Sequence, residues 1–244
     1  MKLLACRYAF AVAAVFCGLA STSPVSAMSR LDEGAVVLRA SGIHSDGVGA
    51  GTIVGIVGTT VRIITAKHVA TFGALTVRFG DGERFPAHIV ESFATRDLAI
   101  IEAEAPPEIA ATLHAAPLAE ATSRASVHVW GSGLNGPSFE PASTDRIGAP
   151  LPDGAAHGRF AMACTLCHEG DSGAGVFDEQ GRLVGVYIGY FAESTASRVS
   201  VAETADAAVV TLARLNSHAA PSTSVAVTDA RANETVVASL SQGK

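Results

Sequence analysis

Three residues of this chain could cooperate in one reaction, because a serine, a histidine and an aspartate each lie in a distinctive short motif. Ser172 lies in Gly-Asp-Ser-Gly, His68 in Ile-Thr-Ala-Lys-His-Val and Asp97 in Arg-Asp-Leu-Ala-Ile. A serine hydroxyl is a weak nucleophile until a base takes its proton, and an imidazole base needs a carboxylate to fix its tautomer. These residues therefore predict a serine hydrolase in which His68 activates Ser172 and Asp97 orients His68.

The motif around Ser172 also predicts where an anionic intermediate would be stabilised. Glycines flank Asp171 and Ser172, and glycine allows tight backbone turns that other residues resist. Such a turn would aim the amide N–H groups of Gly170 and Ser172 at one point, as an oxyanion hole requires. Taken singly, each of the three side chains could equally be a core or turn residue. The prediction therefore depends on their joint occurrence.

The elements that must position these residues are short strands. Segments rich in β-branched residues are separated by Gly, Asp and Pro between residues 35 and 201, with no βαβ pattern. Regular short strands of this kind predict an all-β fold, either a barrel or a sandwich. We expect strands at Ala35–Arg39, Gly51–Val57, Val61–Thr65, Leu75–Phe79, Phe85–Glu91, Leu98–Ala103, Ala125–Trp130, Ser143–Ile147, Gly158–Ala163, Gly175–Phe177, Leu183–Ile188 and Ser197–Val201.

The chain changes character after the last of these strands. Apolar residues recur at helical spacing from Thr204 to Leu215, which predicts a C-terminal helix with Thr204 as its cap. Residues 217–244 are rich in Ser, Thr, Ala and Val without a clean period, and we expect them to form a flexible tail. The acidic, Ala- and Pro-rich stretch 104–122 is expected to connect two groups of strands.

The order of these motifs resembles that of the trypsin-like (chymotrypsin-fold) serine peptidases, and most closely their bacterial HtrA/Deg and glutamyl-endopeptidase branches. The likeness covers roughly residues 35–215 and is carried by segments 51–54, 64–69, 77–82, 97–100, 170–177 and 183–186. It implies two six-stranded antiparallel barrels at about 35–104 and 123–201, followed by the C-terminal helix, in a peptidase domain spanning 28–216. The catalytic cleft would lie between the barrels.

The resemblance also implies how a substrate would bind. The edge segment Ile188, Gly189 and Tyr190 would pair with the backbone of a polypeptide substrate as an added strand, and Leu166 would lie in the specificity pocket. Trypsin-like enzymes that cleave after Lys or Arg carry an Asp at the base of that pocket, and this chain has none there. We therefore expect a small or medium apolar residue before the scissile bond.

The segment Cys164-Thr-Leu-Cys167-His168 has two interpretations. We favour a disulfide between Cys164 and Cys167 that braces the wall of the specificity pocket in an oxidising compartment. The same pattern is the attachment signature of c-type haem, which would make the chain an electron carrier or sensor. A zinc site would need a second ligand cluster, so we predict no metal site and no cofactor. A noncatalytic binding module with a peptidase fold is the remaining alternative.

Residues 1–27 have the features of a secretory signal peptide, with a basic start, a short apolar run and a small-residue cleavage site. Its removal takes away Lys2 and Arg7 and changes the net charge from −6 to −8. An acidic chain is a poor partner for nucleic acid or for anionic lipid. We therefore expect a secreted or periplasmic protein that binds polypeptide substrates, without nucleic acid and without membrane association after cleavage. No particular oligomeric state is predicted.

Overall fold

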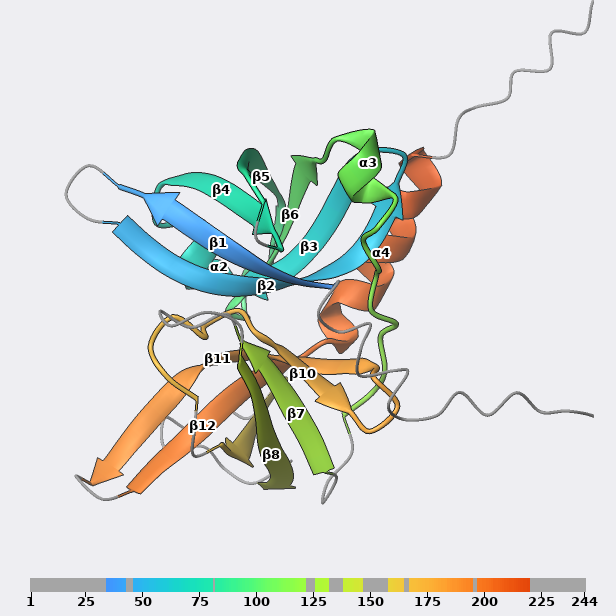
Figure 1. The fold of residues 1–244 in the computed structure, drawn as a ribbon. Coiled ribbons are helices and arrows are strands. Elements are labelled where there is room, and N and C mark those ends of the chain that lie inside the picture. Colours follow the sequence, from blue (N-terminus) through green and yellow to red (C-terminus); the bar gives the residue numbers. More distant parts are fainter. Residues whose placement is uncertain are drawn as a thin grey trace, which may run out of the picture.

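The computed structural model of the chain describes residues 34–42, 46–80, 82–121, 126–131, 138–146, 158–164, 167–194 and 197–219. The predicted signal peptide at 1–27, Leu166 and the predicted tail from residue 220 onward lie outside these residues. The described chain forms two barrels, one stacked on the other, with a helix that runs from their junction along one side of the first (Figure 1).

The first barrel is closed by six antiparallel strands in the order β1-β2-β3-β6-β5-β4. Two single helical turns, α2 and α3, follow β3 and β6 respectively. The elements are β1 (Ala35–Ser41), β2 (Asp46–Val57), β3 (Thr60–Ala66), α2 (Lys67–Ala70), β4 (Ala74–Phe79), β5 (Arg84–Ser92), β6 (Leu98–Glu104) and α3 (Pro107–Ala110).

The second barrel is closed in the same way, in the order β10-β11-β12-β9-β8-β7. Its strands are β7 (Ser126–Gly131), β8 (Ser138–Arg146), β9 (Arg159–Ala163), β10 (Gly175–Asp178), β11 (Leu183–Ser194) and β12 (Ser197–Thr204). The predicted fold class, two six-stranded antiparallel barrels with a C-terminal helix, is therefore confirmed. Closure matters because it leaves neither barrel with an open sheet edge that runs its full length.

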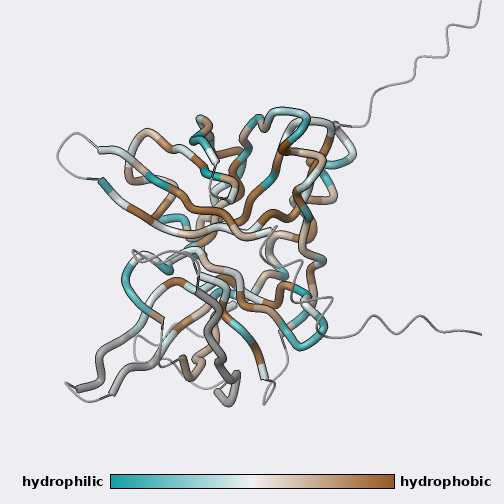
Figure 2. The backbone as a smooth tube through the Cα atoms, in the orientation of Figure 1, coloured by the Kyte–Doolittle hydropathy of each residue, from teal (hydrophilic) through white to brown (hydrophobic). Residues whose placement is uncertain are grey.

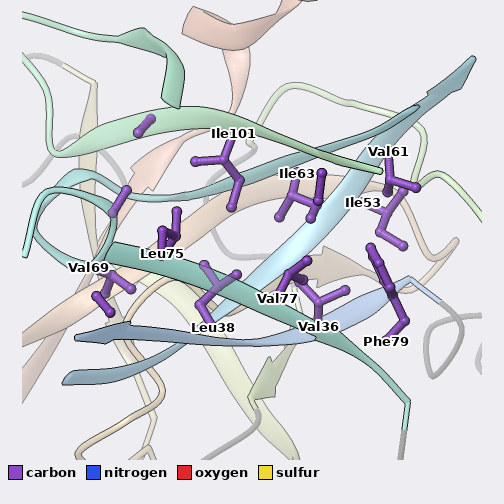
Figure 3. Packing of buried hydrophobic residues seen from close by; sticks show 14 of the residues in the cluster. Val36, Leu38, Ile53, Val61, Ile63, Val69, Leu75, Val77, Phe79 and Ile101 are labelled. Carbon is purple, nitrogen blue, oxygen red and sulfur yellow. The ribbon is translucent and has the colours of Figure 1, made fainter. Parts of the chain in front are cut away.

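Alternation of apolar side chains builds the core of the first barrel. In β1 the side chains of Val36, Leu38 and Ala40 are buried, while Arg39 between them is exposed. Ile53, Ile63, Val77 and Ile101 are among the residues that join them from the other strands (Figure 3). Period-two burial of this kind is what a barrel wall with one apolar face requires.

The two barrels share a second apolar cluster, so β3 and β6 are buried on both faces. Ile64, Leu98 and Ile100 point away from the first core and pack against Phe177 and Leu183 of the second barrel. This explains why both strands are buried over most of their length and carry apolar stretches there, although Arg62 and Glu102 interrupt them (Figure 2). Each wholly buried Ile or Leu side chain contributes about 2 kcal/mol by leaving water. The apolar contact between the barrels is therefore a main source of their mutual stability.

The C-terminal helix α4 (Asp206–Ala219) begins at the junction of the barrels and packs beside the first. Leu212 belongs to the cluster between the barrels, and Arg214 donates to Glu91 of β5 at 2.7 Å. The predicted bounds were wrong at both ends: Thr204 ends β12 instead of capping the helix, and the helix takes in 217–219 from the predicted tail. No helix within the described ranges has the length and apolarity that a bilayer-spanning segment needs.

A close backbone contact between the barrels fixes their relative position. The Ala50 amide of β2 donates to the Ser172 carbonyl at 2.8 Å, and Thr65 Oγ1 donates to the Ala50 carbonyl at 2.7 Å. A Cβ at Gly173 would lie 2.0 Å from the Ala50 carbonyl oxygen and 2.3 Å from Thr65 Oγ1. Gly173 also has φ +92°, which L side chains rarely adopt. Only glycine fits this contact.

Gly173→Ala is expected to separate the barrels locally, because its methyl group would meet backbone that cannot move without breaking the contact. Overpacking together with a left-handed backbone should cost at least about 3 kcal/mol, which lowers Tm by about 6–12 °C. Gly58→Ala is the matched control, since Gly58 has φ +62° but nothing within 4 Å of its added Cβ. Its cost should be about 1 kcal/mol. Equal Tm values for the two variants would contradict the prediction.

Candidate active site

His68 and Asp97 lie side by side in the first barrel. β3 ends at Ala66 and the chain turns directly into α2, so His68 is the second residue of a helical turn. Val69 and Ala70 are buried and fix this turn, whereas the His68 side chain is 49% exposed. His68 Nδ1 lies 2.6 Å from Asp97 Oδ2, and the His68 amide donates to Asp97 Oδ1 at 2.9 Å. Both carboxylate oxygens of Asp97 therefore hold His68.

The carboxyl group of Asp97 is held in its charged form. Burial acts to raise the pKa of Asp97, but the hydrogen bonds from the His68 ring and amide outweigh burial, and Arg159 adds a favourable charge. The pKa of Asp97 is consequently lowered from its ordinary value. A charged acceptor on Nδ1 keeps the proton on that nitrogen, which leaves Nε2 free to act as a base.

Residues of the second barrel hold the backbone of Asp97. The Asp97 amide donates to Glu203 Oε1 at 3.1 Å, and the same oxygen accepts from Arg159 Nε at 2.5 Å. Arg96 Nη1, one residue earlier, donates to Thr204 Oγ1 at 2.8 Å. The loop that carries Asp97 thus leaves the first barrel but is anchored on β9 and β12 of the second.

Sequence reasoning missed Glu203, Arg159 and Arg96 as parts of this site. The predicted strand ended at Val201, although β12 continues to Thr204. Residues 201 and 203 lie on the same face of a strand, and Val201 is buried. The sequence signal for Glu203 was therefore its position, since it is an acidic residue two positions after a buried valine.

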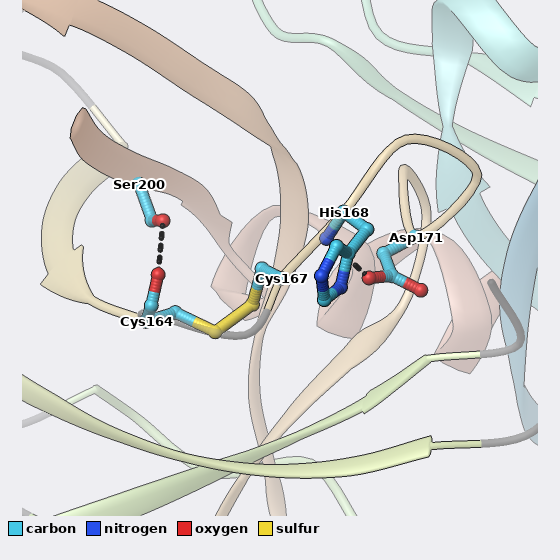
Figure 4. The surroundings of a disulfide bond; sticks show 5 residues. All are labelled: Cys164, Cys167, His168, Asp171 and Ser200. Atoms are coloured by element: carbon cyan, nitrogen blue, oxygen red, sulfur yellow. Dashed lines mark hydrogen bonds between the residues drawn. A yellow bond between two sulfur atoms is a disulfide. The ribbon is translucent and has the colours of Figure 1, made fainter. Parts of the chain in front are cut away.

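Ser172 lies in a glycine turn between β9 and β10. Gly170 and Gly173 both have φ +92°, which allows the reversal around Asp171 and Ser172. The buried Asp171 accepts from the His168 amide at 2.7 Å, and its own amide donates to the His168 carbonyl at 3.2 Å (Figure 4). This reciprocal pair, formed with a backbone amide, locks the turn before the serine.

The amides of Gly170 and Ser172, the predicted oxyanion-hole donors, differ from their neighbours in hydrogen bonding. Within the described ranges, neither amide donates a hydrogen bond to a protein acceptor. The neighbouring amides of Asp171, Gly173 and Ala174 all do. Backbone donors without a protein acceptor are available to a ligand oxygen.

The Ser172 hydroxyl and the His68 ring are not hydrogen-bonded to each other in the described structure. Ser172 Oγ instead donates to the Ile188 carbonyl oxygen at 3.4 Å. The surroundings of Gly49 nevertheless show how near the segments that carry His68 and Ser172 lie to each other. A Cβ at Gly49 would lie 2.6 Å from Val69 Cγ1 and 2.9 Å from the Ser172 carbonyl oxygen. The residue after His68 and the backbone of Ser172 thus lie on either side of one glycine.

The predicted substrate edge lies in the part of β11 that follows Val186. β10 pairs with β11 only as far as Val186, and beyond it, among described residues, β11 has only β12 as a strand partner. The pairing of β11 with β12 is irregular between Tyr187 and Gly189. Gly189 has nothing within 4 Å of an added Cβ, and Tyr190 is 36% exposed. Leu166, the fourth predicted substrate-binding residue, lies outside the described residues.

Cys164 and Cys167 are joined by a disulfide directly before the glycine turn that carries Ser172 (Figure 4). Ser200 Oγ of β12 donates to the Cys164 carbonyl at 3.3 Å, which fixes one end of the linked segment. Thioether attachment of haem needs both sulfurs as free thiols, so the two interpretations of this motif exclude each other. In the part of the chain that the structure describes, no three His, Cys, Asp or Glu side chains gather as a metal site would require.

Comparison with known families decides the class of protein. Residues 49–186, more than half of the chain, match the trypsin-like peptidase domain family. The chain belongs to the trypsin-like peptidase family. It is therefore a serine endopeptidase, and the resemblance inferred from the motifs is confirmed. No curated protein sequence gave a significant match.

Solved structures of proteases share the fold of this peptidase. The active form of the Rv3671c protease from M. tuberculosis has a TM-score of 0.60 and 22% identity, covering 87% of this chain and 92% of that one. The HtrA-type protease AlgW has a TM-score of 0.65 and 19% identity, covering 80% and 64%. A serine endoprotease from Yersinia pestis has a TM-score of 0.61 and 20% identity, covering 80% and 66%. The peptidase thus spans about two thirds of the length of the last two.

The lowered pKa of Asp97 predicts a pH dependence of stability. The carboxylate stabilises the fold fully above the ordinary Asp pKa of about 3.9, and this contribution is lost as the pH falls through the lower pKa of the folded state. The unfolding free energy of the wild type should therefore fall more steeply than that of Asp97→Asn between about pH 5 and pH 3. Urea unfolding of both proteins measures this. Parallel curves would show that the carboxylate is not preferentially charged in the fold.

Removing the disulfide should loosen the turn that carries Ser172. Cys164→Ser/Cys167→Ser is expected to lose about 2 kcal/mol, because the unfolded chain gains the entropy that the short loop had removed. Labelling of Ser172 by a fluorophosphonate should slow as the oxyanion amides lose their fixed direction. Reductant should produce the same slowing in the wild type and none in the double variant. If the wild type keeps its full rate in reductant, the disulfide has no role in the site.

Proposed function

We propose that this peptidase cleaves polypeptides through an acyl-enzyme formed on Ser172, with His68 as the base and Asp97 as its orienting acid. The observation that carries this proposal is the pair of hydrogen bonds by which Asp97 holds the ring and the amide of His68. A structural histidine on a surface turn has no need of a partly buried carboxylate on Nδ1. A general base needs one to set its tautomer.

In the proposed first step, His68 Nε2 accepts the Ser172 proton while Oγ attacks the substrate carbonyl carbon. The amides of Gly170 and Ser172 would donate to the resulting oxyanion, at about 3 kcal/mol for each donor. The proton then passes from His68 to the leaving amine, and the peptide bond breaks. Water repeats the sequence on the ester, with His68 again as the base, and restores the Ser172 hydroxyl.

The long bond from Ser172 Oγ to Ile188 must break before this attack. At 3.4 Å it is a weak hydrogen bond, and catalytic contacts in free enzymes are often formed only when substrate binds. A substrate strand added to Ile188–Tyr190 would offer its own N–H groups to this edge. Binding would thereby compete for the Ile188 carbonyl and release the hydroxyl toward His68.

Covalent labelling tests the proposal directly. A fluorophosphonate should add one phosphonyl group to the wild type, and fluorescently labelled casein should be cleaved. Ser172→Ala should abolish both, and Asp97→Asn should lower the rate by roughly 10⁴-fold because His68 loses its tautomer. Ser217→Ala is the matched control, because this exposed serine of α4 donates to the Arg214 carbonyl of its own helix at 2.7 Å.

The same samples distinguish the alternatives. A noncatalytic module of this fold would remain unlabelled in the wild type, and a c-type haem protein would show a Soret absorbance band and added mass on the cysteines. Labelling that persists in Ser172→Ala would place the nucleophile elsewhere and overturn the assignment.

A further inference from the structure

Glu203 is a buried carboxylate whose position the peptidase fold does not by itself require. It lies on β12 of the second barrel with none of its surface exposed. Its Oε1 accepts from the Asp97 amide at 3.1 Å and from Arg159 Nε at 2.5 Å. Its Oε2 is buried and has no hydrogen-bond partner among the residues that the structure describes. Among the described residues, only one of the two carboxylate oxygens of Glu203 forms hydrogen bonds.

Burying such a group is costly, and an apolar residue would suit the strand better. An ion pair in a protein interior is often no more stable than well-packed apolar residues of the same volume, because both charges lose their water. Arg159 lies directly opposite Glu203 in the β9–β12 ladder and is 22% exposed. The pair alone therefore gives little reason for a carboxylate here. The bond to the Asp97 amide is the feature that a hydrophobic pair could not replace.

That bond acts on the backbone of Asp97, whose carbonyl also accepts from the Lys67 amide at 3.2 Å. Both carboxylate oxygens of Asp97 are taken by His68. The direction of the side chain then depends on how its backbone is held. Glu203 Oε1 fixes the amide, and Arg96 Nη1 ties the preceding residue to Thr204 Oγ1 and to Asp206 Oδ1, at 2.8 and 2.9 Å.

We propose that Glu203 is a positioning residue for Asp97, holding the acid of the triad against His68 from the opposite barrel. The inference rests on the proposed function, since it assigns a role only if Asp97 orients the base. Glu203 touches neither the reacting atoms nor a substrate. Its effect passes through the Asp97 backbone, so a loss of Glu203 should change the rate of the chemical step more than the binding of a ligand.

The charges around Asp97 define what a pH profile would report. His68 on α2 faces its carboxylate, while Glu203 of β12 and Arg159 of β9 face its backbone, and Arg96 lies beside it. Glu203 and Arg159 offset each other in the wild type. Glu203→Gln removes one negative charge near His68, so the acid limb of the labelling profile should move to lower pH. That shift follows from the charge alone, so the positioning of Asp97 is tested by kinact.

The main test removes the ion pair and keeps the volume. Glu203→Met/Arg159→Met removes both partners of the ion pair together, so Tm should stay within about 5 °C of the wild type. The Asp97 amide has nevertheless lost its acceptor. The maximal rate of fluorophosphonate labelling, kinact, should therefore fall about tenfold or more, with KI changed less than about threefold. A folded double variant with the wild-type kinact overturns the inference.

A second pair of variants gives a result even if the double variant does not fold. Glu203→Gln keeps an oxygen at the same reach, so it should retain kinact within about threefold at the pH of its plateau. Glu203→Asp keeps the charge for Arg159 but shortens the reach to the Asp97 amide by one carbon, so it should label more slowly. If Glu203 serves only to neutralise Arg159, the order is reversed and the inference fails.

Two controls distinguish a failure of the role proposed for Glu203 from a failure of the proposed function. Arg62→Met/Glu102→Met removes a second largely buried Arg–Glu pair, whose Nε–Oε1 distance is 2.8 Å, from the first barrel away from the site. It should likewise leave Tm within about 5 °C of the wild type, and it should not lower kinact. Asp97→Asn is measured in parallel. If it labels normally, the proposed function itself has failed, whereas a slow Asp97→Asn beside a fast Glu203→Met/Arg159→Met rejects only the role of Glu203.

Discussion

The hydrogen bond from the Ala50 amide to the Ser172 carbonyl is the constraint on which the site depends. It joins β2 of the first barrel to the turn of the second at the candidate nucleophile itself. Backbone groups can approach so closely only where side chains are missing, and Gly49 and Gly173 supply the two gaps. The buried side chain of Ala50 even packs within the apolar cluster of the second barrel. The position of Ser172 and the docking of the two barrels therefore depend on the same backbone contact.

The two barrels hold each other's functional residues. Ser172 belongs to the second barrel and is fixed by Ala50 of the first, while Asp97 leaves the first barrel and is fixed by Glu203 of the second. Neither contact can be formed by a barrel on its own. The apolar cluster shared by β3, β6, β10, β11 and α4 supplies most of the free energy that keeps the barrels together. The directional contacts then select one alignment among those that apolar packing allows.

The sequence predicted best what is encoded locally. Alternation and turn residues led to the strands, the three short motifs led to the candidate triad, and the two barrels were implied by the family resemblance. Strand ends were poorly predicted where pairing overrides local preference. β8 begins at Ser138, five residues before the predicted start, because β7 pairs with a polar segment that contains Pro141. β2 begins at Asp46, although Gly47 and Gly49 are weak strand formers.

The contacts of Glu203 could not be predicted for a different reason. Glu203 and Asp97 are 106 residues apart, and no local pattern states which backbone amide a buried carboxylate will meet. Its burial could be suspected from the alternation with Val201, but its partner follows only from how the barrels dock. Residues that support a site from another element are in general visible only after the tertiary structure is known, because their signal is a distance and not a motif.

The hydrogen bond between Ser172 Oγ and the Ile188 carbonyl bears on how such a site would remain inactive without substrate. A neutral hydrogen bond of this length contributes at most about 1 kcal/mol, which is small beside the free energy of adding a strand of substrate to the edge of β11. In the proposed mechanism the edge that binds the substrate backbone is also the edge that holds the hydroxyl. Substrate binding and release of the nucleophile would then be coupled through one carbonyl oxygen, without movement of either barrel.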